Sequence, residues 1–161
     1  MQKLCILLMV SILLIASLCS AYCPSYPNVK QEFAESKLVF IGKVISEEKV
    51  HESSDGYFDG INYTILVVET LRGKLGQVVM VFSENSSGRF PMETGETYLV
   101  FTSLTPDTFA GVPVYTISYC GNSGKVQEKK NALSLARKLS KSLSSKNLKS
   151  HGLQLSTSRY H

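Results

Sequence analysis

The sequence predicts an all-β domain with flanking helices, built as a small barrel or sandwich. Five short runs rich in Val, Ile, Tyr, Phe and Thr follow one another, with turn residues between them. A stretch with helical periodicity comes after the last run. The 161 residues include an apolar N-terminal segment, and the remainder is long enough for one domain with its own core.

The N-terminus predicts export. Lys3 precedes an apolar run from Leu4 to Leu18, and small residues follow at Ser20 and Ala21. This is the pattern of a secretory signal peptide, and the run is short for a hydrocarbon core ~30 Å thick. We therefore expect residues 1–21 to be removed and the protein to be secreted. An uncleaved membrane anchor is the alternative.

The elements of the mature chain can be placed in order. Prolines favour extended backbone up to Asn28, which can cap a short helix whose Val29 and Phe33 share a face. Gly42 is expected to mark a bend or bulge in the first strand, and a hairpin joins the second strand to the third. The five strands are expected at Leu38–Val50, Ile61–Leu71, Val78–Phe82, Thr97–Thr102 and Val114–Tyr119.

A C-terminal amphipathic helix is expected beyond Cys120, with Asn122 or Ser123 capping its start. Its apolar stripe is predicted to pack on the barrel and consists of Ala132, Leu135, Ala136, Leu139 and Leu143. Residues 22–144 would then form the domain. Residues 145–161 are rich in Ser, Lys and His and predict a disordered basic tail.

The charge is distributed unevenly. The segment from Tyr22 to Gly124 has seven basic and twelve acidic residues, whereas the rest of the chain has nine basic residues and only Glu128 against them. Outside the cell, such a tail suggests a polyanionic matrix partner rather than nucleic acid. The alternative is that the lysines only solvate the helix and the tail. The candidate partner-binding lysines are Lys138, Lys141, Lys146 and Lys149.

Only Cys23 and Cys120 remain once the signal segment is removed. Two cysteines in an oxidising compartment most simply form one disulfide. Two free thiols or an intermolecular pair are the alternatives. A bridge over a loop of ~100 residues contributes roughly 4–5 kcal/mol in the chain-entropy description.

Nothing in the sequence has the spacing of an active site or a metal site. The three histidines lack a second ligand type at metal spacing, and no HExxH, CxxC or Gly-x-Ser-x-Gly motif occurs. The carboxylates of one polar loop are expected to be solvated. We therefore expect that the protein is not an enzyme and that it has no cofactor of its own. These histidines and carboxylates are His51, His151, His161, Glu47, Glu48, Glu52 and Asp55.

Two sequons predict N-glycosylation if the protein is made in a eukaryotic secretory pathway. Asn62-Tyr63-Thr64 has the better acceptor but falls at the start of a strand, where backbone pairing can hide it. Asn85-Ser86-Ser87 falls in a polar loop.

Several segments, taken in order, have a familiar pattern with a cysteine at each end. They are Cys23-Pro24…Pro27, Phe33, Val39–Val44, Tyr63…Leu71-Arg72-Gly73, Gly95–Val100 and Tyr115–Cys120. In this order the sequence resembles the netrin-like domain and, within it, the N-terminal domain of the tissue inhibitors of metalloproteinases. The resemblance covers most of the mature domain and implies a five-stranded OB-type barrel with flanking helices. It also supports Cys23–Cys120 as a retained bridge.

The sequence departs from these inhibitors in its cysteines. The inhibitors open with Cys-x-Cys and have three disulfides in this domain. Here Ala21 stands at the place of the first cysteine, and the loop from Ser83 to Glu93 lacks its usual partner. The third pair is missing at both ends. Loss of cysteines in pairs leaves no orphaned thiol.

The resemblance implies a site at the N-terminus. In the inhibitors, the free α-amine and carbonyl of the first residue chelate the zinc of the protease, and the next side chain enters its specificity pocket. A cut after Ser20 would make Ala21 the chelating residue. A cut after Ala21 would make the N-terminal segment that contacts the protease, which we call the wedge, one residue shorter. The implied protease-contacting wedge is Ala21, Tyr22, Cys23, Pro24 and Ser25, beside a loop of Asn85, Ser86, Ser87 and Gly88.

Two functions therefore compete. The first is a secreted single-domain metalloproteinase inhibitor, whose contact with a metal would be with the zinc of its target protease. The second is a non-inhibitory netrin-like module that binds matrix, glycosaminoglycan or growth-factor partners through the basic tail. A basic host-defence or membrane-active protein is a third interpretation. We expect a monomer without nucleic-acid binding or stable membrane insertion.

Overall fold

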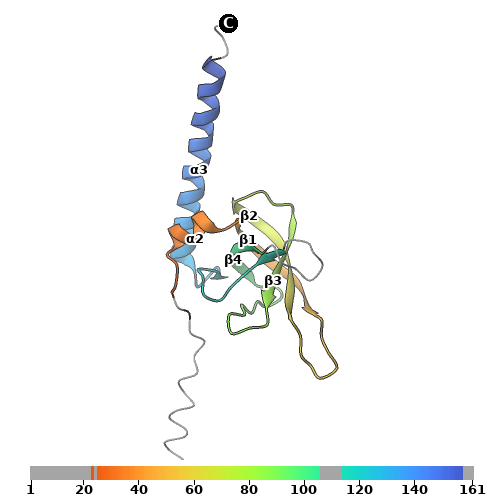
Figure 1. Cartoon of the computed structure of the whole chain (residues 1–161). Coiled ribbons are helices and arrows are strands. Elements are labelled where there is room, and N and C mark those ends of the chain that lie inside the picture. Colours follow the sequence, from red (N-terminus) through yellow and green to blue (C-terminus); the bar gives the residue numbers. More distant parts are fainter. Residues whose placement is uncertain (1–22, 24, 106–113, 158–161) are drawn as a thin grey trace, which may run out of the picture.

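The computed structural model describes residues 23, 25–105 and 114–157, with the side chains of 146–157 excepted. The predicted signal segment, residues 1–21, lies outside the described residues. The described chain has two helices and six strands (Figure 1). In order they are α2 Val29–Glu35, β1 Leu38–Val50, β2 Gly60–Arg72, β3 Val78–Glu84, β4 Thr97–Thr105, β5 Val114–Thr116, β6 Gly124–Lys125 and α3 Lys130–Thr157.

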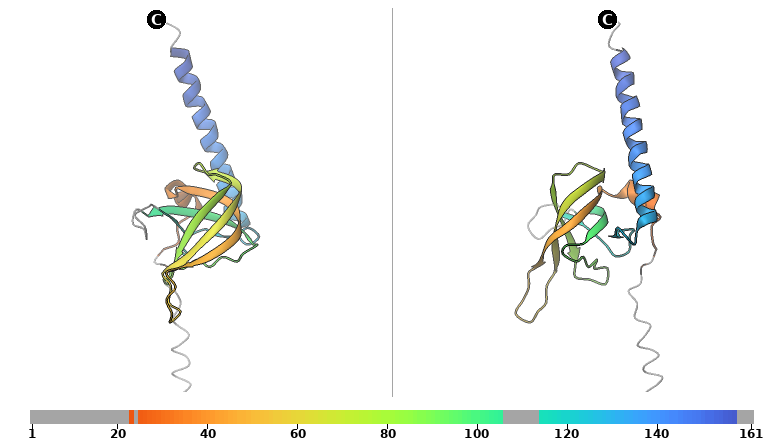
Figure 2. Two further views of the ribbon diagram at one scale, coloured as in Figure 1. Left: turned by 90° about the vertical axis from the view of Figure 1, so that its right-hand side faces the viewer. Right: turned by 180° about the vertical axis from the view of Figure 1, so that it is seen from behind.

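Five of these strands form a ring. β1 pairs antiparallel with both β2 and β4, so the order β1-β2-β3-β5-β4 closes on itself. β3 and β5 pair in parallel, and the other ring pairs are antiparallel. The short β6 adds to β4 beside Tyr98 and Leu99. The ring is irregular because β5 has only three residues and the β1–β2 ladder shifts register three times. The predicted β-rich class with flanking helices is confirmed (Figures 1 and 2).

The bend predicted at Gly42 is confirmed, since the β1–β2 register shifts between Ile41 and Gly42. A Cβ atom at this position would collide with the Cγ2 of Ile65 on β2. Glycine therefore lets the two strands approach where β1 bends. The predicted hairpin between β2 and β3 is confirmed too, with Leu66 opposite Val78. The fifth strand is shorter than predicted and ends at Thr116.

Two apolar clusters lie on opposite faces of β1 and β4. The first fills the ring and includes Phe40, Val44, Tyr63, Ile65, Val81, Tyr98 and Val100. The second lies between the ring and the helices and includes Phe33, Val39, Ile41, Leu71, Leu99, Phe101, Ala132, Leu133 and Ala136. Because both faces are covered, β1 and β4 have unbroken buried runs at their apolar ends.

The predicted start of α2 is confirmed. The side-chain oxygen of Asn28 accepts a hydrogen bond from the backbone N–H of Gln31 at 2.9 Å, which satisfies one of the free donors at the helix start. Phe33 is buried in the second cluster, and Val29 packs against the same cluster from one turn before. This short helix therefore covers part of the outer face of β1 and β4.

The register predicted for the C-terminal helix was wrong in part. α3 begins at Lys130, so neither Asn122 nor Ser123 caps it. Its buried residues are Ala132, Leu133 and Ala136, with Leu139 half-buried. Leu135 and Leu143 of the predicted stripe are 40% and 37% exposed. The helix turns its small alanines toward α2 and the ring, and this orientation buries Leu133 on one flank and leaves Leu135 outside.

The backbone of α3 continues to Thr157, whereas the sequence predicted a disordered tail from residue 145. The stretch contains no proline, and Gly152 is its one strong helix-disfavouring residue. In both views of Figure 2 the later turns project away from the strands. Within the described part of the chain, no helix combines the length and the apolar character needed to cross a membrane.

Candidate functional site

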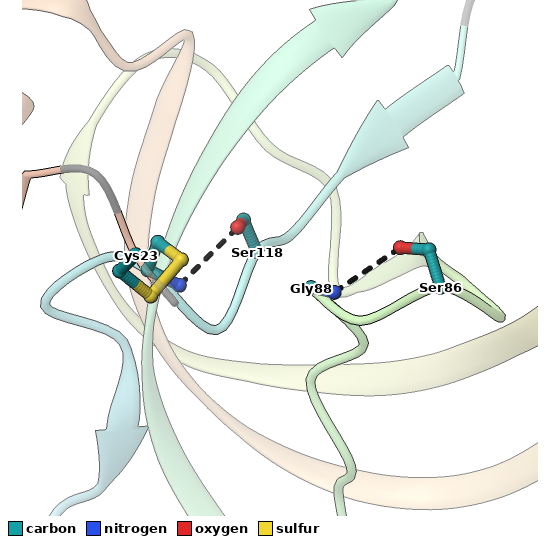
Figure 3. The surroundings of a disulfide bond; sticks show 5 residues. Cys23, Ser86, Gly88 and Ser118 are labelled. Carbon is teal, nitrogen blue, oxygen red and sulfur yellow. Dashed lines mark hydrogen bonds between the residues drawn. A yellow bond between two sulfur atoms is a disulfide. The ribbon is translucent and has the colours of Figure 1, made fainter. Parts of the chain in front are cut away.

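The predicted disulfide is present and joins the beginning of the described chain to the segment that follows β5. Cys23 and Cys120 are bonded, with 97 residues of sequence separation and Cα atoms 5.5 Å apart (Figure 3). The hydroxyl oxygen of Ser118 accepts a hydrogen bond from the backbone N–H of Cys120 at 3.2 Å. The bond therefore holds Cys23 against the segment of residues 117–120.

The same segment holds the loop that was predicted to flank the N-terminus. The backbone N–H of Tyr119 donates to the carbonyl oxygen of Gly88 at 3.0 Å, and that of Ile117 donates to Phe82 at 3.1 Å. Figure 3 shows Gly88 and Ser86 beside Ser118 and the disulfide. The structure thus brings together two of the predicted regions, Cys23 and the loop of residues 85–88. We call the joined segments, residues 23, 85–88 and 117–120, the disulfide edge.

The loop of residues 85–88 is held by its own hydrogen bonds. The backbone N–H of Asn85 donates to Asp59, and its side-chain amide donates to the carbonyl of Phe58, both at 2.8 Å. The hydroxyl of Ser86 accepts from the N–H of Gly88 at 3.2 Å. These bonds tie the loop to the turn between β1 and β2. They order it although it has no cysteine for the bridge found in the resembling family.

A groove of about 490 Å³ lies between the disulfide edge and the ends of β4 and β5. Its lining is rich in hydroxyl groups, which include those of Ser86, Ser103, Thr105, Thr116 and Ser118. Thr116 shares hydrogen bonds with Ser103 at 3.0 Å and with Thr105 at 3.1 Å. Hydroxyl groups can donate and accept hydrogen bonds, so this lining suits the backbone or polar side chains of a peptide.

The half-buried carboxylate of Glu32 connects α2 to the turn after the disulfide. The Oε2 atom of Glu32 accepts hydrogen bonds from the backbone N–H of Asn122 at 2.7 Å and from its side-chain amide at 2.6 Å. The same amide donates to the carbonyl of Pro27 at 2.9 Å. Burial raises the pKa of Glu32 from its ordinary value of 4.5, and the hydrogen bonds from Asn122 oppose this only in part. Sequence reasoning missed Glu32 because only the fold places it over Gly121.

A second groove, of about 360 Å³, is lined in part by Tyr119. Its lining combines the aromatic residues Tyr26, Phe90, Tyr98 and Tyr119 with charged and polar residues, which include Glu93, Asn122, Lys125, Glu128 and Lys129. Lys125 and Glu93 close one end through an ion pair with Nζ and Oε2 2.9 Å apart, which raises the pKa of Lys125. Residues of the disulfide edge therefore line two grooves, one rich in hydroxyl groups and one with a mixed aromatic and charged lining.

The remaining predicted residues are dispersed. Ser25 is exposed, whereas Ala21, Tyr22 and Pro24 lie outside the described residues. Asn62 lies on β2, opposite Phe82 of β3, and Lys138 and Lys141 lie on α3. Lys146 and Lys149 belong to the part of α3 whose side chains lie outside the described set.

His51 contacts Asp59 at the end of the β1–β2 hairpin, with Nδ1 and Oδ2 2.8 Å apart. Across the described residues, no group of three or more His, Cys, Asp or Glu side chains has an arrangement that could hold a metal ion. No family model matches the sequence, and no curated protein matches it either.

Proposed function

We propose that this chain is a secreted netrin-like protein with an OB-type barrel, which inhibits an extracellular metalloproteinase through its free N-terminus. The strand order of the ring, with one parallel pair between β3 and β5, suits the partly open five-stranded barrel of the OB class. The residues that resemble the netrin-like domain extend from Cys23 to Cys120, which are the two ends of the disulfide. The fold and the sequence pattern thus support the same class of protein.

The observation that carries the inhibitor proposal is the position of the disulfide beside the loop of residues 85–88. A mature chain that begins at Ala21 or Tyr22 has only one or two residues before Cys23, so its α-amine is close to this anchor. An α-amine has an ordinary pKa of ~7.7–8.0, so a useful fraction is neutral and can ligate zinc near neutral pH. Anchoring the wedge before binding lowers the entropy cost of association.

The test begins with N-terminal sequencing of the secreted protein, because the residue exposed by signal cleavage is the proposed ligand. The native protein and a form with one extra N-terminal residue are then titrated against a panel of metalloproteinases. We expect inhibition by the native form to fall by orders of magnitude in the extended form, because the added residue occupies the place of the metal. A form extended by one residue at the C-terminus is the matched control and should inhibit normally.

Unfolding curves of the three forms should coincide, which separates loss of the wedge from loss of the fold. Equal inhibition by native and N-terminally extended protein would contradict the wedge mechanism. Absence of inhibition by every form would leave the netrin-like module without protease activity and would favour the second candidate below.

A specific observation favours a polyanion-binding module as the second candidate. A groove of about 540 Å³ runs along α3 and is lined by Lys130, Lys138 and Lys141 together with Val126 and Leu133. Arg137 also lines it, but its guanidinium forms a bidentate pair with Glu69, with Nη2 and Oε2 2.6 Å apart. The three lysines therefore supply the groove's remaining positive charge, which suits a sulfated glycan.

Binding to a heparin column tests this candidate. The double variant Lys138→Gln/Lys141→Gln should elute at markedly lower salt than the native protein, because each lost charge removes an ionic contact. The variant Lys30→Gln/Lys37→Gln removes the same charge from exposed positions outside the groove and is the matched control. Equal shifts for the two variants would show that net charge, rather than the groove, controls retention.

A further inference from the structure

The outer face of β2 and β3 is apolar and exposed. Along β2, Tyr63 and Ile65 point into the ring and are buried. Side chains alternate along a strand, so Thr64 and Leu66 face outward. Leu66 pairs with Val78 across the two strands, and Thr64 pairs with Met80. Four exposed side chains form what we call the outer strip: Leu66, Val68, Val78 and Met80, which are 42%, 64%, 50% and 57% exposed.

Asn62 lies on the same face as the outer strip. It is two residues before Thr64 and four before Leu66, so strand alternation puts all three side chains on one side of β2. Asn62 lines a groove of about 450 Å³ together with Leu75, Val78 and Met80. Among the described residues, its side-chain amide has no hydrogen-bond partner. The acceptor amide of the sequon Asn62-Tyr63-Thr64 is therefore not held by the described fold, and this half-buried residue lines a groove beside apolar surface.

The other sequon is arranged differently. The side-chain nitrogen of Asn85 donates to the carbonyl of Phe58 at 2.8 Å, and its side-chain oxygen accepts from Arg89 at 3.3 Å. This amide holds the loop of residues 85–88 against the β1–β2 turn. A sugar on its nitrogen would have to share the space of the bond to Phe58. Asn62 is half-buried to the same class, so the hydrogen bonds of Asn85, and not its burial, distinguish the two sequons. The folded protein thus favours a glycan on Asn62 over one on Asn85.

We propose that Asn62 carries an N-linked glycan when the protein is made in a eukaryotic secretory pathway, and that its first sugars cover the outer strip. In the transfer, the Nδ2 atom of Asn62 bonds to C1 of the reducing-end sugar of a lipid-diphosphate-linked oligosaccharide. The bond from C1 to the diphosphate oxygen breaks, the lipid diphosphate leaves, and Nδ2 loses one proton. No oxidant or reductant is needed.

The position of Asn62 explains how the glycan meets the strip. A sugar attached in the groove starts next to Val78 and Met80, and the C–H face of a pyranose ring can pack on such side chains while its hydroxyls remain in water. Covering the strip removes apolar surface of the kind that otherwise drives self-association on exposed strand faces. The proposal uses none of the residues of the disulfide edge, so it does not depend on the inhibitor mechanism.

The first experiment is peptide mapping of the full chain secreted from a eukaryotic host. An amidase that removes N-linked glycans leaves aspartate at each site that carried one, so the peptide mass identifies the site. We expect aspartate at Asn62 and unmodified amide at Asn85. Thr64→Ala should abolish the glycan on Asn62, whereas Thr64→Ser retains the sequon and should keep it. Mapping of the wild-type protein decides the site even if Thr64→Ala is not secreted.

The second experiment tests coverage of the strip. Enzymatically deglycosylated wild-type protein should self-associate more in sedimentation analysis, and bind more of a dye that reports apolar surface, than the glycosylated form. Deglycosylated Val78→Thr/Met80→Thr protein should show less of both effects. A glycan found on Asn85 alone, or on neither residue, would overturn the site. A deglycosylated protein that stays monomeric and binds no additional dye would overturn the coverage.

Discussion

Strands β1 and β4 differ from strands β2 and β3 in how they are covered. At their apolar ends, β1 and β4 have the ring cluster on one face and helices α2 and α3 on the other, so residues such as Val39 and Leu99 are fully buried. Over most of their length β2 and β3 face the ring cluster on one side and have the exposed outer strip on the other, and only the end of β2, at Leu71, reaches the second cluster. Unbroken apolar runs therefore mark the first pair, and alternation marks much of the second.

The difference shows that the helices act as a local cap on the ring. α2 and α3 contact each other and the second cluster, while Glu32 and the disulfide attach the chain segments that enter these helices. We call this the capped side and the outer face of β2 and β3 the bare side. The same amino-acid substitution should therefore lower the free energy of unfolding more on the capped side than on the bare side.

The largest expected effect comes from removing the bridge that closes the capped side. Replacing both cysteines, as Cys23→Ser/Cys120→Ser, releases a loop that spans 97 residues of sequence separation. The free energy of unfolding should fall by roughly 4–5 kcal/mol, because the unfolded chain regains loop entropy. Urea unfolding of the oxidised wild-type protein and the double variant gives the difference. A loss below about 1 kcal/mol would show that the bridge adds little to the packed capped side.

Burial of a charge under α3 should have the next largest effect. Leu133→Asp puts a carboxylate without a partner into the second cluster, which should lower the free energy of unfolding by about 3 kcal/mol or more. Leu135→Asp changes a neighbouring residue that is 40% exposed and should cost about 1 kcal/mol or less. Chemical denaturation of both variants makes the comparison. Equal losses would contradict the orientation of α3 described above.

A matched pair of small substitutions compares the two sides directly. Val39→Thr buries a hydroxyl at a position with 0% exposure and should cost about 1–3 kcal/mol. Val78→Thr makes the same change on the outer strip, where water can satisfy the hydroxyl, and should stay within about 0.5 kcal/mol of wild type. Both residues are β-branched in either form, so strand propensity changes little. The two melting temperatures should therefore separate clearly, and if they coincide the capped side is looser than its burial indicates.

The smallest expected effect is a pH dependence that originates at Glu32. Because burial raises the pKa of Glu32 in the folded protein above 4.5, the folded state binds its proton more tightly than the unfolded state. The contribution of Glu32 to stability should therefore be most favourable at low pH and decline as pH rises from about 4.5 through the folded pKa. The sign is opposite to that of an exposed, ion-paired carboxylate.

Denaturation midpoints between about pH 4 and about pH 7 test this sign. Glu32→Gln keeps an acceptor oxygen for Asn122 and should remove the decline, while Glu35→Gln, at an exposed position of the same helix, should keep it. A decline that persists unchanged in Glu32→Gln would assign the pH dependence to another group.

Local patterns were enough to predict the elements whose residues interact with near neighbours in sequence. Asn28 caps α2 through a residue three positions away, and Gly42 bends β1 where the alternation pauses. The pairing of Cys23 with Cys120 was predictable because only these two cysteines lie outside the predicted signal segment.

The features that were missed depend on contacts between distant segments. Asn122 and Ser123 look like helix caps, yet Asn122 binds Glu32 and the hydroxyl of Ser123 accepts a hydrogen bond from the N–H of Phe101 at 2.9 Å. Leu133 and Leu135 are equally apolar, and only the packing of α2 against α3 decides which is buried. The loop beside the disulfide could be placed from the family resemblance, but the hydrogen bond from Tyr119 to Gly88 that holds it could not.

The disulfide also sets an order of events during synthesis. Cys23 precedes all the described strands, and Cys120 is made only after all five strands of the ring have been translated. At ~5–20 residues per second, the ribosome needs roughly 5–20 s to make the intervening chain, while hairpins such as β2–β3 form in microseconds. Cys23 therefore cannot pair with Cys120 until the chain of the ring has been made. An oxidant that acts after this point should consequently give the correct bond more often than one that acts earlier.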